Sequence, residues 1–130
     1  MFKNITTNLM VENVTTSVEF YQKMLELEVL ASVPEEGPTL QFAILSNETL
    51  TLMVQEKNNL AEEYPILATE KIQPSISLYI TVTDFDTLYQ QIEEIYPIYT
   101  KVHRTFYGAK EFAIEDPDGY VLTFAEYQEG

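Results

Sequence analysis

Residues 112–126 read FAIEDPDGYVLTFAE, a pattern that predicts a tight β-hairpin. Apolar residues alternate with others on both sides of the Asp-Pro-Asp-Gly at 116–119. In that tetrapeptide the proline fixes φ for a turn, the first aspartate can accept hydrogen bonds from the backbone ahead of it, and the glycine tolerates positive φ. After the turn, Leu122 and Phe124 alternate with Thr123, so we expect Leu122 and Phe124 to point into the core.

The part of the chain before this hairpin, taken together with the hairpin itself, shows the same order of strand and helix signals twice. The first half predicts a strand over 5–12, a helix that follows the capping Asn13, and strands over 28–33, over 39–45 and after the turn at 46–48. The second half predicts a strand over 75–82, a helix over 85–95 that follows Asp84 as the first helix follows Asn13, and strands over 97–106, 110–115 and 120–127. A short helix ended by Pro65 and a polar linker lie between them. Each half therefore reads βαβββ.

A single βαβββ unit covers only one face of its sheet with its helix, so the other face must meet a second layer. We therefore expect an α+β fold, in which two paired βαβββ modules form a curved mixed sheet with a concave cleft. The 130 residues suit one such domain, with modules at about 1–57 and 74–130 and a linker at about 58–73. The modules could pair within one chain or across a dimer.

Period-2 patterns distinguish the two faces of the expected sheet. We expect a set of aliphatic residues to lie under the helices: Leu50, Leu52, Val54, Ile76, Leu78, Ile80 and Val82. The alternating positions hold serine, threonine, methionine and tyrosine, among them Met53, Ser77 and Tyr79. This second face is too polar for a dry core, so we interpret it as the lining of a cleft that solvent can enter.

The composition excludes several functions. The chain has no cysteine, which excludes disulfides, thiolate zinc sites and cysteine nucleophiles. Its net charge of −14 repels phosphate backbones and anionic lipid surfaces, so nucleic acids and membranes are poor partners. No apolar run approaches the roughly 18 residues that span a membrane, and residues 1–4 do not begin like a secretory leader. We expect a soluble cytoplasmic protein.

Three features together resemble the vicinal-oxygen-chelate superfamily, which includes glyoxalase I, bleomycin-resistance proteins and extradiol dioxygenases. They are the paired βαβββ units, the opening stretches at 9–14 (LMVENV) and 20–25 (FYQKML), and the closing hairpin with the equally typical YGAKEF at 107–112 before it. The resemblance covers nearly the whole chain. For metal-dependent members it implies ligands on the cleft side of four strands, a His or Gln and a Glu from each module.

The resemblance places the four metal-ligand positions at Thr6, Met53, Ser77 and Thr123, with Gln55 beside Met53 on the same face. Hydroxyl groups, a thioether and one amide do not hold a divalent metal at useful affinity, because such a site needs imidazole or carboxylate donors. We therefore expect no metal, no other cofactor and no catalytic residue.

The sequence thus favours a metal-independent small-molecule-binding protein that resembles bleomycin-resistance and other antibiotic-resistance proteins. The resemblance implies a homodimer that holds a cationic, aromatic-bearing drug. The acidic charge and the Ser, Thr and Tyr lining suit such a cationic or aromatic ligand. We expect the ligand-binding residues to be Thr6, Asn8, Met10, Met53, Gln55, Ser77, Tyr79 and Thr123.

Two alternatives stay open. The chain could be a metal-dependent glyoxalase-like lyase, isomerase or dioxygenase with a displaced site, built from Gln55, His103 and either Glu56 or Glu111. Alternatively, the cleft could be vestigial and the protein could act through its dimer interface. We interpret His103, the one histidine, as a partly exposed structural residue. Four further aromatic residues could stack on a ligand or pack in a core or dimer surface: Phe42, Tyr64, Phe106 and Tyr107.

Overall fold

The computed structural model describes residues 1–127 and divides the chain into two compact units, Met1–Gln73 and Pro74–Gly130. The elements of the first unit are β1 (Thr7–Val11), α1 (Val14–Leu25), β2 (Glu28–Val33), β3 (Phe42–Ser46), β4 (Thr51–Glu56), α2 (Lys57–Glu63) and a 3₁₀ turn, η1 (Pro65–Leu67). Those of the second unit are β5 (Ser77–Thr81), α3 (Phe85–Ile95), β6 (Thr100–Arg104), β7 (Ala109–Glu115) and β8 (Val121–Tyr127). The last three residues of the predicted second module lie outside the described residues.

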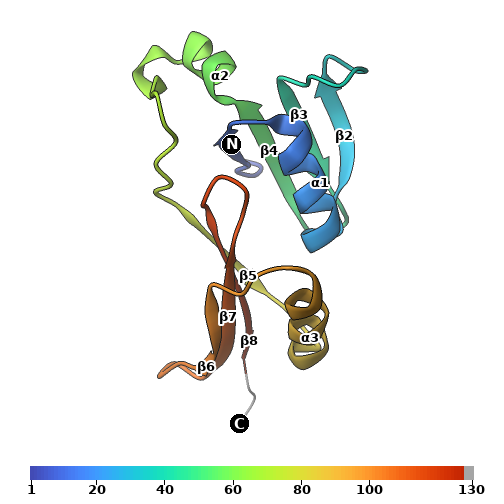
Figure 1. The fold of residues 1–130 in the computed structure, drawn as a ribbon, viewed down its shortest axis with the longest axis vertical. Helices are drawn as coiled ribbons and strands as arrows, with labels where there is room; N and C mark the ends of the chain where they lie inside the picture. The colour runs from blue at the N-terminus through green and yellow to red at the C-terminus, as the bar shows by residue number, and fades with distance from the viewer. Residues whose placement is uncertain (128–130) are drawn as a thin grey trace. The chain divides into compact units, whose positions relative to one another are not determined.

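Each unit holds one four-stranded mixed sheet with the same strand order. In the first sheet the order is β1-β4-β3-β2, and β1 runs parallel to β4 while the other pairs are antiparallel. The second sheet has the order β5-β8-β7-β6, again with one parallel pair, β5 and β8. Figure 1 shows α1 lying along the first sheet and α3 beside the second. The predicted α+β class with two βαβββ modules is confirmed.

The first unit buries the face of its sheet that α1 covers. Alternate residues of β1, β3 and β4 are at most 5% exposed, and they are Leu9, Val11, Ala43, Leu45, Leu52 and Val54. The predicted core residues of the helix, Phe20, Tyr21 and Met24, are buried as well. Asn13 begins the helix as predicted, because its side-chain oxygen accepts a 2.9 Å hydrogen bond from the backbone of Thr16.

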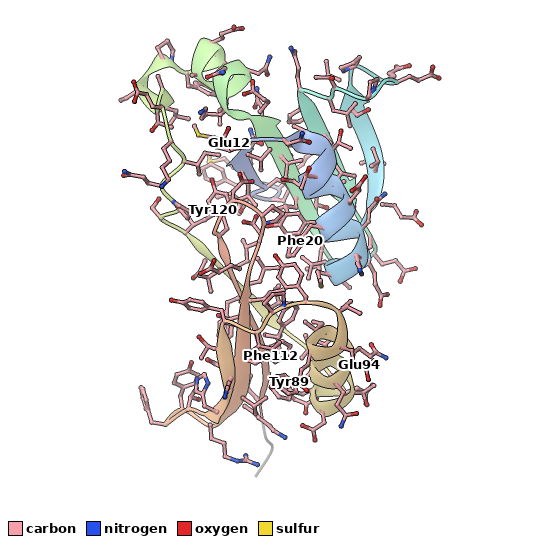
Figure 2. The ribbon with its side chains drawn as sticks, viewed as in Figure 1. Glu12, Phe20, Tyr89, Glu94, Phe112 and Tyr120 are labelled. Atoms are coloured by element: carbon pink, nitrogen blue, oxygen red, sulfur yellow. The ribbon has the colours of Figure 1, made fainter. Side chains whose placement is uncertain are left out.

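In the second unit Phe112 of β7 is the centre of an aromatic core. Its ring packs edge to face against Phe85 and Tyr89 of α3, with centroids 5.3 and 5.0 Å away, and stacks on Phe124 of β8 at 5.0 Å. Figure 2 shows Phe112 and Tyr89 side by side between the sheet and the helix. The predicted core positions Leu122 and Phe124 are buried, at 0% and 1% exposure.

The closing hairpin turns as its sequence predicts. The Asp116 carboxylate accepts 2.9 Å hydrogen bonds from the backbone N–H groups of Asp118 and Tyr120. Gly119 has a φ of +94°, and a Cβ there would lie 3.3 Å from the side chain of Pro74. The positive φ therefore favours a glycine here, and the close approach of Pro74 would also crowd a larger side chain.

Three local expectations need correction. Ile76 is 42% exposed instead of lying under a helix, because β5 begins at Ser77, two residues after the expected start of the strand, and Ile76 lies outside it. The expected strand over 97–106 is shorter, Thr100–Arg104, and pairs with β7 through a register shift. Asp84 occupies the position that corresponds to Asn13, but it has a left-handed φ of 53° and its side chain makes no cap bond.

Candidate functional site

The first unit brings four of its five predicted ligand residues together on one sheet face. In the parallel pairing of β1 with β4, Asn8 lies beside Met53 and Met10 beside Gln55. Strand alternation places these four side chains opposite the face that α1 covers. Thr6 comes just before the first residue of β1.

The amide of Gln55 is engaged within this unit. Its Oε1 accepts a 2.9 Å bond from Asn8, and its Nε2 donates to Asn59 at 2.7 Å and to Glu63 at 3.3 Å. Asn59 in turn donates to Gln41 at 3.0 Å. Gln55 is only 7% exposed, so this amide chain ties β1 and β4 to α2. A ligand on this face would contact Asn8, Met10 or Met53 more readily than Gln55.

The three predicted residues of the second unit share one face of its sheet. Tyr79 of β5 lies beside Thr123 of β8, and Ser77 lies beside Val121. Tyr79 is 47% exposed, whereas its strand neighbours Leu78 and Ile80 face the helix side and are less exposed. The predicted division of β5 into an aliphatic and a polar face is therefore present.

On that polar face, four residues surround Glu111 of β7, and we call these five residues together the Glu111 cluster. The hydroxyls of Tyr79 and Tyr107 donate to Oε2 of Glu111 over 2.6 and 2.5 Å. The hydroxyl of Tyr127 lies 2.9 Å from that of Tyr79. His103 of β6 brings its Nε2 to 3.8 Å from Oε1 of Glu111.

The Glu111 cluster places a buried carboxylate beneath half-exposed rings. Glu111 is 6% exposed, while Tyr79, Tyr107 and Tyr127 are 47%, 47% and 48% exposed. Because Tyr79 uses its proton to reach Glu111, the contact between the two tyrosine hydroxyls requires Tyr127 to donate to Tyr79. Desolvation and the bond to Glu111 raise the pKa of Tyr79 above its ordinary value. The bond to the same carboxylate raises the pKa of Tyr107.

The sequence predicts a role for Glu111 only in the alternative metal site, and it predicts no role for Tyr127. One signal was available for Glu111: it stands between Ala109 and Ala113 at the alternating positions of its strand. Small neighbours on the same face leave room for other side chains to converge on a charged one. Which side chains converge depends on the pairing of four strands, and the sequence alone does not fix that pairing.

The residues at the four positions that the resemblance assigns to metal ligands do not fit a metal. They offer the hydroxyls of Thr6, Ser77 and Thr123 and the thioether of Met53, which are poor donors for the divalent ions that polarise oxygen. Within residues 1–127 there is also no group of three or more His, Asp or Glu side chains that could hold one.

A pocket of about 350 Å³ lies elsewhere in the second unit. It follows α3 and adjoins the closing turn, and its lining residues are Tyr96, Pro97, Ile98, Tyr99, Glu115 and Asp116. None of the predicted ligand residues belongs to it. Because several polar side chains converge in the Glu111 cluster, we treat that cluster, and not this pocket, as the stronger candidate site.

No helix in the described part of the chain is long and apolar enough to cross a membrane.

The two βαβββ units define an α+β protein of the glyoxalase type, and sequence comparison identifies the family. The profile of the Glyoxalase/Bleomycin resistance protein/Dioxygenase superfamily matches residues 5–124. The chain therefore belongs to that superfamily. No curated protein matches it closely enough to add a more specific relative.

Solved structures share the fold at low sequence identity. A glyoxalase/bleomycin resistance protein/dioxygenase from Nocardioides is 18% identical, with a TM-score of 0.83 over 100% of this chain and 87% of its own. A lactoylglutathione lyase from Agrobacterium tumefaciens is 18% identical, with a TM-score of 0.74 over 95% and 92%. TioX from Micromonospora sp. ML1 is 14% identical, with a TM-score of 0.73 over 98% and 100%. At these identities the likeness concerns the fold alone.

Proposed function

We propose that this chain is a metal-independent member of the superfamily that binds a small organic molecule on the polar faces of its sheets. One observation carries the proposal: the four positions that the family resemblance assigns to metal ligands carry Thr6, Met53, Ser77 and Thr123 here. Without imidazole or carboxylate groups there, the chain lacks the means to hold a Lewis acid at that place. The hydroxyl and thioether groups can still contact an organic ligand.

The ligand class that we propose is cationic or aromatic. The net charge of −14 attracts cations. The half-exposed rings of Tyr79, Tyr107 and Tyr127 offer faces on which a planar group can stack. The predicted ligand residues, Thr6, Asn8, Met10, Met53, Gln55, Ser77, Tyr79 and Thr123, remain our proposal for the lining, with the Glu111 cluster added to them. An antibiotic-resistance role by sequestration would follow if the ligand is a drug.

We also propose that the protein acts as a cytoplasmic homodimer. The outer strand β2 supports a partner surface, because Val29, Leu30 and Val33 are 41%, 71% and 55% exposed. Exposed apolar side chains along a sheet edge favour association with another chain. Sedimentation of the purified protein tests this, and a monomer at micromolar concentration would contradict it.

Metal analysis and a binding screen together test the main proposal. We expect the purified protein to contain no stoichiometric divalent metal, and we expect added Zn²⁺ or Ni²⁺ to leave its melting temperature unchanged. Cationic or aromatic compounds should raise the melting temperature, because a ligand that binds only the folded state stabilises it. A stoichiometric metal bound by the chain would contradict the proposal. An absence of stabilisation by every compound would instead favour the vestigial-cleft alternative.

The enzymatic alternative has one observation in its favour. His103 and Glu111, two residues of the displaced metal site considered above, lie together in the second unit with Nε2 and Oε1 3.8 Å apart. The other two candidates, Gln55 and Glu56, belong to the first unit, where Glu56 caps α2 and Gln55 bonds Asn8. Lactoylglutathione lyase activity that appears on addition of Ni²⁺ or Zn²⁺ would establish this alternative.

A further inference from the structure

Glu111 is a buried carboxylate whose charge the chain leaves largely unbalanced. It is 6% exposed, and within residues 1–127 the one basic side chain near it is His103, whose Nε2 lies 3.8 Å from Oε1 and which balances the charge only when its ring is protonated. The adjacent Lys110 does not compensate it, because that side chain contacts Asp86 and the ring of Phe85. Buried carboxylates are ordinarily paired with a cation, since leaving them alone is costly.

The hydrogen bonds around Glu111 leave one of its oxygens open. Oε2 accepts the hydroxyls of Tyr79 and Tyr107. Within residues 1–127, no hydrogen bond reaches Oε1. One oxygen is therefore satisfied by the chain, while the other has lone pairs that only a further donor could use.

His103 presents a second acceptor to the same place. Its Nδ1 lies 3.0 Å from the backbone oxygen of Lys101, and because a carbonyl can only accept, Nδ1 carries the hydrogen. In the neutral ring Nε2 is then an acceptor. Two acceptors, Nε2 of His103 and Oε1 of Glu111, thus lie 3.8 Å apart with no donor between them.

We propose that the Glu111 cluster binds a primary ammonium group of the ligand, with its N–H donors shared by Glu111 and His103. This inference rests on the proposed small-molecule-binding function and names the chemistry of its ligand. Ammonium-to-acceptor bonds are about 2.9 Å long, so one nitrogen can reach two acceptors that lie 3.8 Å apart. The faces of Tyr79, Tyr107 and Tyr127 would contact the carbon atoms next to the charge.

The same geometry disfavours a quaternary ammonium. A trimethylated nitrogen has no N–H, so it would cover Oε1 of Glu111 and Nε2 of His103 without satisfying either. The rings of Tyr107 and Tyr127 have centroids only 6.3 Å apart, which leaves no room for a methylated cation between them. Recognition here depends on directed hydrogen bonds more than on an aromatic cage.

Three probes with the same ring separate these possibilities: benzylamine, benzyltrimethylammonium and benzyl alcohol. Isothermal titration calorimetry at neutral pH, where benzylamine is protonated, compares their affinities. We expect benzylamine to bind about tenfold or more tightly than either of the others, which is the ratio expected for a charge-assisted hydrogen bond to a buried carboxylate. Equal or tighter binding of benzyltrimethylammonium would overturn the proposal.

Variants assign the effect to the cluster. Glu111→Gln keeps an oxygen acceptor for the two tyrosine hydroxyls but removes the charge, and should weaken benzylamine about tenfold or more. Glu115→Gln makes the same charge change on the same face of β7, four residues along, and should leave the affinity unchanged. His103→Phe alters an exposed side chain, so the fold should survive while amine affinity falls several-fold.

The outcomes distinguish this inference from the function on which it rests. If neutral aromatic compounds stabilise the protein while benzylamine does not, the ammonium subsite is wrong and small-molecule binding stands. If benzylamine binds but Glu111→Gln and His103→Phe bind it as tightly as the parent protein, the subsite lies elsewhere and the proposal is overturned. If nothing binds at all, both proposals fail.

Discussion

The hydroxyl of Tyr79 on β5 donates a 2.6 Å hydrogen bond to the carboxylate of Glu111 on β7, although β8 lies between these two strands. The bond can form because Ala125, the β8 residue directly beside Glu111, presents only a methyl group. This side-chain bond therefore links β5 to β7, two strands that have no backbone pairing with each other. The arrangement also holds the tyrosine proton against a buried negative charge.

We predict that this bond makes stability depend on alkaline pH. The pKa of Tyr79 is raised in the folded protein by desolvation and by Glu111, so the folded state holds its proton more tightly than the unfolded chain does. The contribution is present below the unfolded value of about 10 and is lost as pH rises above it. Urea unfolding across this range should show a steeper fall for the parent protein than for Tyr79→Phe. Parallel curves for the two proteins would contradict the interpretation.

The aromatic core of the second unit should be sensitive to loss of Phe112. This residue is 0% exposed and contacts three other rings, so Phe112→Ala should lower the free energy of unfolding by about 3–5 kcal/mol. Phe106→Ala is the matched control, because Phe106 is 100% exposed and its removal leaves no cavity. Chemical denaturation measures both changes. A large loss in the Phe106 variant would show that this side chain is covered in solution, as a dimer surface would be.

Substitutions at the residues that precede the two helices, Asn13 and Asp84, should change stability by different amounts. Asn13→Ala removes the bond to the backbone of Thr16 and should cost about 1 kcal/mol. Asp84→Gly removes no cap bond and relieves a left-handed φ of 53°, so it should be neutral or slightly stabilising. Thermal unfolding of the two variants provides the comparison. Equal destabilisation would mean that Asp84 caps its helix after all.

The fourth prediction concerns the side-chain amide of Gln55, which both donates and accepts hydrogen bonds in the first unit. Gln55→Glu replaces the Nε2 that donates to Asn59 and Glu63 with an acceptor, and sets a second carboxylate beside Glu63. We expect a loss of about 1–3 kcal/mol at neutral pH. Gln41→Glu is the control, because Gln41 uses its oxygen to accept from Asn59 and a carboxylate can do the same.

The loss in the Gln55→Glu variant should diminish in acid. Repulsion by Glu63 raises the pKa of the introduced carboxyl in the folded state, so protonation favours folding. Relative to the parent protein, stability should recover as pH falls towards about 4, the ordinary range of a glutamate. A pH-independent difference between the two proteins would indicate a packing defect instead of a lost donor.

The sequence predicted the fold well because each signal was local. The closing turn needed only Asp116 and Gly119, and the first helix needed Asn13 and an apolar stripe that included Tyr21. The same local rules failed at Asp84, where the residue type suggested a cap but the backbone takes a left-handed conformation. Position in a repeat indicates where a helix begins, but the backbone dihedral angles decide whether the side chain can reach it.

For the candidate site, the sequence by itself determined which metal-binding side chains are missing. No carboxylate or imidazole stands at Thr6, Met53, Ser77 or Thr123, and that absence can be read from a single chain. Only the tertiary structure decided what is present. It placed Tyr107 and Tyr127 around Glu111, because β7 and β8 pair in one register and the turn before β7 brings Tyr107 back over its own strand. Side chains that meet across paired strands are distant in sequence, so their meeting follows from sheet register, which no local pattern of residues specifies.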